Sequence, residues 1–226
     1  MVTSFQINDK KYSLNFPDNF PIQAQINELA RRKWYEVPVP EVGVVIDAGA
    51  NVGTYSLYMS AFAKKVYAIE PLTLNYNLLE KNIKENKIDN ISSYKFAFAG
   101  TPGDRYLYTS YNKSDTSAYS LLPVGELAEI VKTKTIAQFM KDENIELVHI
   151  LKTDIEGEEQ EMFSADDFGD VARKIICITG EYHIQCRNLQ EVLEYHGYDY
   201  SVNSRGMYTA VRRIERVELP TPHFIN

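Results

Sequence analysis

A regular alternation of strand patterns and helix patterns constrains the fold of this chain more than any other feature. Residues 44–48 and 147–153 are largely apolar runs, as in strands that are covered on both faces. The other expected strands are 65–69, 91–99, 174–179, 198–203 and 207–211. The expected helices are 54–63, 72–86, 135–142, 156–163 and 189–196. Because repeated strand–helix units build a parallel sheet with helices on both faces, we predict an α/β fold that binds ligands at the carboxyl ends of its strands.

Two parts of the chain depart from this rhythm. The beginning combines two short strand patterns, a helical pattern and two prolines, at 4–7, 11–16, 22–33, Pro38 and Pro40. We interpret residues 1–40 as a small N-terminal cap that precedes a single domain over 41–226. Residues 104–131 are rich in Tyr, Ser and Asp, and we expect them to run over the sheet.

The composition excludes several classes of protein. Hydrophobic residues make up 44% of the 226, enough for one domain with a sizeable core. The 31 acidic and 24 basic residues give a net charge of -7, which disfavours a nucleic-acid partner. Cys177 and Cys186 form no C-x-x-C pair, no apolar run reaches the ~20 residues of a membrane span, and the polar N-terminus does not resemble a signal peptide. We expect a cytoplasmic protein without a membrane partner, and leave its oligomeric state open.

The best-defined motif is a glycine loop over residues 47–53, between the strand expected over 44–48 and the helix expected over 54–63. Gly49 and Gly53 let the backbone approach a ligand closely, and Asn51 tolerates a left-handed conformation. Glu70 ends the next strand, where a carboxylate can accept both hydroxyl groups of a ribose. These residues indicate a cofactor that contains adenosine.

Asp47 narrows the choice of cofactor. Its carboxylate stands where a dinucleotide would place its pyrophosphate, so it opposes phosphate and favours a ligand with an ammonium and a sulfonium group. S-adenosylmethionine carries both. The chain has no G-x-x-x-x-G-K-[ST] motif, which argues against a nucleoside triphosphatase. A tight turn without any ligand is the alternative interpretation.

Acidic residues follow the strand over 147–153. Asp154 is expected at the same sheet edge as Asp47, and Gly157 permits a sharp turn into the next helix. Glu156, Glu158 and Glu159 are expected in the first turn of that helix, where negative charge suits the helix dipole. We interpret Glu159 and Glu161 as helix-start residues without a chemical role. Asp154 is the residue of this segment to which we assign a function.

Glu181 and His183 follow the strand over 174–179 and come to the same edge. We assign Asp154, Glu181 and His183 to catalysis. The unperturbed pKa of histidine is about 6.5, so an imidazole can accept a proton near neutral pH. Our hypothesis is that His183 is the base and that Asp154 or Glu181 orients the acceptor or the imidazole. We assign no metal site, although these three side chains could also hold a divalent ion.

Four segments are similar to the motifs of the FkbM-type methyltransferases, in that family's order. They are Val45 to Gly53, Ala68 to Pro71, Thr133 to Phe139, and Leu151 to Glu159. Ala137, Gln138 and Glu158 depart from the family pattern outside the cofactor motif. The resemblance implies a class I, Rossmann-like methyltransferase fold with a seven-stranded, mostly parallel sheet and an antiparallel last strand. It implies methyl transfer from S-adenosylmethionine to a small molecule, often to a hydroxyl oxygen of a sugar or natural product.

Other interpretations remain open on the sequence alone. A basic group could serve an RNA methyltransferase, and its members are Arg31, Arg32, Lys33, Arg212, Arg213 and Arg216. A non-enzymatic module that binds the cofactor or a partner is a second alternative. Aromatic residues could wall a substrate pocket or pack the cap on the domain, and these are Trp34, Tyr35, Tyr106, Tyr108, Tyr111 and Tyr119.

Overall fold

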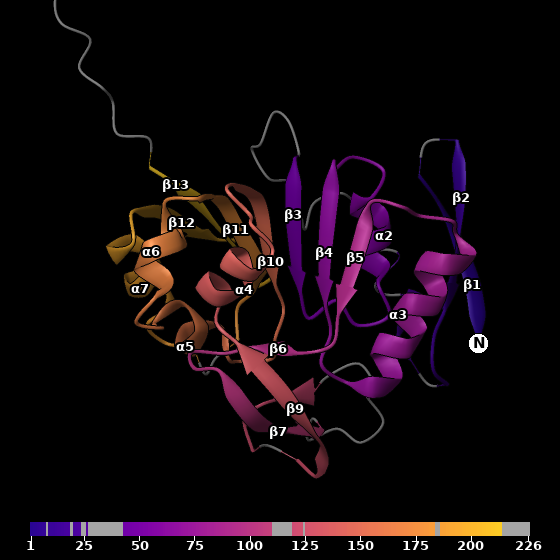
Figure 1. Ribbon diagram of the computed structural model, residues 1–226, viewed down its shortest axis with the longest axis horizontal. Coiled ribbons are helices and arrows are strands. Elements are labelled where there is room, and N and C mark those ends of the chain that lie inside the picture. The colour runs from indigo at the N-terminus through magenta and orange to yellow at the C-terminus, as the bar shows by residue number, and fades with distance from the viewer. Residues whose placement is uncertain are drawn as a thin grey trace, which may run out of the picture.

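A seven-stranded sheet forms the centre of the protein (Figure 1). The computed structural model describes residues 1–7, 9–18, 20–23, 26, 43–109, 119–123, 125–183 and 186–213. The strand order is β12-β13-β11-β10-β3-β4-β5. The strands are β3 (Val44–Ala48), β4 (Lys65–Ile69), β5 (Ile91–Tyr94), β10 (Val148–Thr153), β11 (Ile175–Glu181), β12 (Tyr198–Val202) and β13 (Met207–Arg212).

The pairing of the strands confirms the predicted topology. Strands β11, β10, β3, β4 and β5 run parallel to one another. The last strand, β13, lies between β11 and β12 and is antiparallel to both. It forms a hairpin with β12 around Gly206, whose φ of 80° is in the left-handed region that favours glycine. The parallel strands therefore end at a common edge.

Helices cover both faces of this sheet. Consecutive residues of each buried strand point to opposite faces, and each face packs into its own hydrophobic core. Ile46 and Leu151 belong to one core, and Val45 and Ile150 to the other. The first core packs against α4 (Ile136–Asp142), α5 (Glu159–Phe163), α6 (Phe168–Ala172) and α7 (Leu189–Tyr195). The second packs against α2 (Thr54–Met59) and α3 (Thr73–Glu85).

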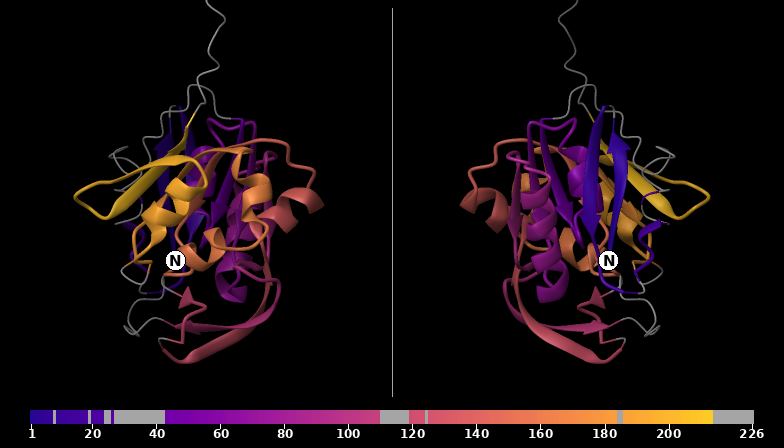
Figure 2. Two further views of the ribbon diagram at one scale, coloured as in Figure 1. Left: turned by 90° about the vertical axis from the view of Figure 1, so that its left-hand side faces the viewer. Right: turned by 90° about the vertical axis from the view of Figure 1, so that its right-hand side faces the viewer.

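The region after β5 differs from the prediction. The single strand expected over 91–99 is two strands, because β5 ends at Tyr94 and β6 (Ala97–Phe98) joins a second sheet. That sheet has the order β6-β9-β7-β8 and includes β7 (Gly103–Thr109), β8 (Tyr119–Ser120) and β9 (Leu127–Lys134). Figures 1 and 2 show β7 and β9 beyond the carboxyl ends of the central strands rather than over a face of the sheet.

The N-terminal hairpin confirms the two short strands expected there. Strands β1 (Val2–Ile7) and β2 (Lys10–Asn15) pair antiparallel, and β2 packs against α3. The fully buried Asn82 of α3 connects this hairpin to the glycine loop. Its Oδ1 accepts hydrogen bonds from the backbone N and Nδ2 of Asn15, and its Nδ2 donates to the carbonyl oxygens of Asn15 and Val52.

Some expectations concern residues outside the described part of the chain. These include most of the helix expected over 22–33, the two prolines after it, and the residues Arg31, Arg32, Lys33, Trp34, Tyr35, Tyr111 and Arg216. The division into 1–40 and 41–226 stays a prediction. Within the described ranges, no helix has both the length and the apolar character that crossing a membrane requires.

We predict that Asn82→Ala lowers the free energy of unfolding substantially. The substitution leaves buried groups of Asn15 and Val52 without partners, at a cost of about 1–3 kcal/mol for each group. Urea denaturation followed by circular dichroism measures the change. Asn77→Ala, on the exposed side of the same helix, is the matched control. A loss for Asn82→Ala no larger than the control's would contradict this account of the connection.

Candidate active site

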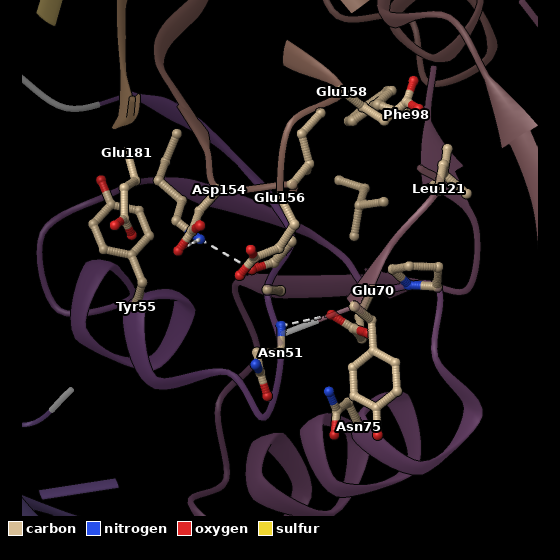
Figure 3. A pocket seen from close by; sticks show the side chains of 18 of the residues that line it. Asn51, Tyr55, Glu70, Asn75, Phe98, Leu121, Asp154, Glu156, Glu158 and Glu181 are labelled. Atoms are coloured by element: carbon tan, nitrogen blue, oxygen red, sulfur yellow. Dashed lines mark hydrogen bonds and ion pairs between the residues drawn. The ribbon is translucent and has the colours of Figure 1, made fainter. Parts of the chain in front are cut away.

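A cavity of about 340 Å³ opens where the central strands end. It is lined from the loop after β3, the end of β4, the loop after β10 and the end of β11. Residues of the second sheet close another side, among them Phe98 and Leu107. Figure 3 shows Asp154 and Glu181 at one end, Glu70 and Asn75 on the floor, and Phe98 and Leu121 at the far end. The cavity therefore has an acidic end and an apolar end.

The glycine loop has the backbone conformation that its sequence predicts. Gly49, Asn51 and Gly53 have φ values of 75°, 54° and 92°. A Cβ atom on Gly49 would lie 2.0 Å from the carbonyl oxygen of Asp154, so only glycine fits between the two loops. Gly49 and Asn51 line the cavity, whereas Gly53 is the N-cap of α2. A Cβ atom on Gly53 would collide with the side chain of Leu79.

Glu70, directly after β4, stabilises this loop by a hydrogen bond. It is 5% exposed, and its Oε2 accepts a 2.8 Å hydrogen bond from the backbone N of Asn51. Its Oε1 accepts one of 2.9 Å from the backbone N of Leu72. Burial raises the pKa of Glu70 to about 7, against the lowering effect of these two bonds. The carboxylate faces the cavity at the position that the sequence assigned to a ribose contact.

Asp47 lies below the cavity rather than in it. It is fully buried at the end of β3, and its Oδ2 accepts a 2.6 Å hydrogen bond from Ser56 Oγ. Its Oδ1 is 3.1 Å from Nζ of Lys152, which also donates to the carbonyl oxygen of Gly49 at 2.9 Å. Burial disfavours the charge on Lys152, but Asp47 and Asp154 outweigh it and raise its pKa. The charge of Asp47 is thus paired within the protein, and Asp47 is not among the residues that line the cavity.

The loop after β10 turns before its helix begins, which corrects the expected start at residue 156. Glu156 and Gly157 have φ values of 57° and 105°, and Glu158 caps α5, so the helix starts at Glu159. Glu156 is consequently not a first-turn residue. Its side chain lines the cavity, and its carbonyl oxygen accepts a 2.7 Å hydrogen bond from Ser120 of β8.

Glu159 connects this loop to His183, a role that we did not expect for a helix-start residue. It is fully buried, and its carboxylate accepts 3.0 Å hydrogen bonds from the backbone N of Ile155 and of Gly157. Its Oε1 is also 3.1 Å from Nδ1 of His183. Burial opposes the charge on Glu159, but His183 lowers its pKa. The turn and the imidazole thus form one hydrogen-bonded unit.

The structure brings the three predicted catalytic residues together at the acidic end, with Glu156 added. Nε2 of His183 is 3.6 Å from Oε2 of Glu156. Burial lowers the pKa of His183, but Glu159, Asp154 and Glu156 outweigh it and raise the value to about 9. Burial, followed by the charge of Asp154, raises the pKa of Glu156 to about 7 and also raises the pKa of Glu181. With a pKa of about 9, the imidazole of His183 holds its proton at neutral pH when no other cation occupies this end of the cavity.

The apolar end contains Ala97, Phe98, Leu107 and Leu121, together with Tyr119. Tyr119 therefore fits the predicted aromatic wall, whereas Tyr106 is 53% exposed and does not line the cavity.

Two polar side chains are buried on the walls. Asn75 is 2% exposed, and its Oδ1 has no hydrogen-bond partner among the described residues. Glu158 is 1% exposed and 3.5 Å from Arg105, and burial followed by Glu161 raises its pKa to about 8.

This geometry agrees with the comparison of the sequence with known families. Residues 47–200 match the methyltransferase FkbM domain. The chain belongs to the FkbM methyltransferase family. The match includes the glycine loop, Glu70, the turn after β10 and His183. Membership of this family supports S-adenosylmethionine as the cofactor, as the sequence motifs predicted.

The chain is also similar to individual methyltransferases and to solved structures. It is 24% identical over 157 residues to Methyltransferase 1 of Beauveria bassiana, which covers 60% of the chain and 63% of the relative. It is 30% identical over 89 residues to an uncharacterized RNA methyltransferase of Lactiplantibacillus plantarum, covering 37% and 20%. The crystal structure of methyltransferase FkbM from Methylobacillus flagellatus KT superposes with a TM-score of 0.54 at 12% identity, covering 79% and 46%. The chain thus spans less than two thirds of the length of each, and the last comparison supports the class I fold.

The sequence alone assigned no role in the site to three charged residues, Lys152, Glu156 and Glu159. Lys152 is a lone cation inside an apolar strand, and that pattern could have indicated a buried partner such as Asp47. Glu159 is indistinguishable from a surface helix-start residue by sequence, because its partners come from a different loop. The sequence did not indicate that Glu156 faces the cavity, because its orientation depends on the left-handed turn.

We predict that Lys152→Met strongly destabilises the enzyme. It leaves Asp47 as an unpaired buried charge, and breaking such a pair costs about 3–5 kcal/mol. Combining it with Asp47→Asn removes that charge but keeps an acceptor for Ser56, so the double variant should be more stable than Lys152→Met alone. Chemical denaturation of the single and double variants measures both. A Lys152→Met protein within about 0.5 kcal/mol of wild type would show that the pair is unimportant.

Proposed function

We propose that the enzyme transfers the methyl group of S-adenosylmethionine to a hydroxyl oxygen of a small-molecule acceptor. One observation carries this proposal. A single cavity joins the glycine loop and Glu70 to an end that contains Asp154, Glu181 and His183. A cofactor that occupies the first part presents its reactive end to the second part.

The lining of the cavity gives the cofactor one favoured orientation. The ribose hydroxyls donate to Glu70, and the adenine lies toward the apolar end at Phe98 and Leu121. The methionine portion follows Gly49 and Asn51 toward Asp154, whose carboxylate attracts the sulfonium and ammonium groups. In this proposal Asp47 and Gly53 support the binding loop without touching the cofactor, Asp47 through Lys152.

The acidic end suits a neutral or cationic acceptor. Asp154, Glu156 and Glu181 all line the cavity there, so phosphate and carboxylate groups are repelled. Methyl transfer is an in-line displacement in which the sulfonium loses its charge. The protein mainly aligns the oxygen, the methyl group and the sulfur, and orientation of this kind contributes about 7–11 kcal/mol.

In this proposal a carboxylate takes the proton of the acceptor molecule's hydroxyl group. This revises the hypothesis that His183 is the base. Glu181 is our candidate, because it lines the cavity and makes no hydrogen bond to His183 comparable to that of Glu159. Its raised pKa makes it a stronger base than an ordinary carboxylate. His183 and Asp154 then hold the acceptor oxygen and the cofactor in line.

The alternative of an RNA acceptor fits the charges less well. Val211 pairs with Cys177, so Arg212 and Arg213 lie toward the start of β11, whereas the cavity is at its end. Arg213 is also paired with Asp199 at 2.7 Å. The described arginines of the candidate basic group therefore lie at the opposite edge of the sheet from the cavity.

The test is incubation of the enzyme with isotope-labelled S-adenosylmethionine and either a small-molecule extract or total RNA. Mass spectrometry should find the labelled methyl group on oxygen in a small molecule. A label found only in RNA would favour the alternative acceptor. The absence of any transfer while the cofactor still binds would favour a non-enzymatic binding module.

We predict that affinity for S-adenosylhomocysteine falls as the pH decreases below about 7. Ribose hydroxyls bind the ionised form of Glu70, so the carboxyl group, with a pKa of about 7, must lose its proton before binding. Linkage then gives a decrease of roughly tenfold per pH unit. Calorimetry between pH 5.5 and ~8 measures it, and Glu70→Gln should bind more weakly with a flatter profile. Identical pH profiles for the two proteins would refute the assignment.

We predict that Glu181→Gln lowers kcat by about 10²–10⁴-fold and leaves cofactor affinity unchanged, since a placed base contributes a factor of that size. Single-turnover kinetics with the labelled acceptor and calorimetry with S-adenosylhomocysteine separate the two quantities. Glu191→Gln, an exposed glutamate of α7, is the control. Turnover of Glu181→Gln at the control's rate would remove Glu181 from the chemistry.

A further inference from the structure

Three side chains at the acidic end are spaced as metal ligands. Asp154, Glu156 and His183 each offer one ligand atom, and these atoms all lie within 4.8 Å of one another. We propose that they bind a divalent first-row metal ion, which holds the acceptor oxygen; this role rests on the proposed function. The set differs from the one considered on sequence, because Glu156 takes the place of Glu181. One imidazole and two carboxylates suit ions such as Mn²⁺ and Zn²⁺.

The environment of His183 is that of a metal-binding imidazole. Its Nδ1 is committed to the fully buried Glu159 at 3.1 Å, so its Nε2 is directed toward Glu156. A carboxylate behind a histidine fixes the ring and its tautomer in many metal sites. Here the same carboxylate also holds the backbone of Ile155 and Gly157, and hence the loop that carries the other two ligands. The site is therefore assembled before an ion arrives.

The charges around the cluster favour a cation. The carboxylates of Asp154, Glu156 and Glu181 share one end of the cavity, with Glu159 behind them. Lys152 is closer to Asp47 than to Asp154, because its Nζ is 3.1 Å from Asp47 and 3.9 Å from Asp154. Carboxylates held this close repel one another unless a cation lies between them. A dication relieves that repulsion.

The position of the cluster suits methyl transfer. The carbonyl oxygen of Asp154 is packed against Gly49, so the ion lies beside the loop that carries the cofactor. A bound ion lowers the pKa of a coordinated hydroxyl group. The O–H bond then breaks with the proton going to Glu181, the acceptor oxygen bonds to the methyl carbon, and the S–CH₃ bond breaks to leave a neutral thioether. The ion undergoes no redox change.

Titration with Mn²⁺, followed by electron paramagnetic resonance, tests the site. The wild-type enzyme should take up one equivalent of Mn²⁺, and Glu156→Gln and His183→Gln should weaken this binding at least about tenfold. Glu159→Gln should weaken it about 10–100-fold although Glu159 does not touch the ion. His196→Gln and Glu191→Gln, which change residues outside the cavity, are the controls, and circular dichroism verifies folding.

Several outcomes would overturn the proposal. They are no Mn²⁺ uptake by wild type, uptake that survives both Glu156→Gln and His183→Gln, or full methyl transfer in the presence of a chelator. The last result would leave the proposed function intact and remove only the metal. Uptake of Mn²⁺ that depends on these residues, without any methyl transfer to the small-molecule extract, would instead support the site and count against the proposed function.

Discussion

The buried ion pair between Lys152 and Asp47 is the interaction on which the site depends. It joins the two central strands, β10 and β3, directly beneath the glycine loop, and the same ammonium group holds the carbonyl oxygen of Gly49. Because both charges are buried, neither can be removed alone without a large cost. The pair also means that Asp47 adds no net charge to the cavity. The negative potential that attracts the cofactor therefore comes from the loop after β10 and the end of β11.

That negative end is built in advance of any ligand. Glu159 hydrogen-bonds to the turn at Ile155 and Gly157 and to His183, so residues from two strands are held in one arrangement. Glycine at position 49 lets this turn lie against the cofactor loop. Rigid strand ends and a fixed turn can align an oxygen, a methyl group and a sulfur atom, and alignment is the main requirement of methyl transfer.

The sequence predicted the fold well where periodicity and motifs were strong. The parallel strands, the antiparallel β13 and the positive φ of Asn51 all follow from it, whereas the split of β5 and β6 depends on pairing between Ala97 and the distant Thr133. In the site, Asp154, Glu181 and His183 converge as predicted. The roles of Glu156 and Glu159 could not be predicted, because burial and side-chain partners depend on tertiary contacts that no local pattern records.

The measurement that tests this account most directly is a crystal structure of the enzyme with S-adenosylhomocysteine. The account predicts that the ribose hydroxyls bind Glu70, that the adenine lies against Phe98 and Leu121, and that the sulfur faces the space between Asp154, Glu181 and His183. A product bound in the reverse direction, or with its sulfur directed away from these three residues, would contradict it.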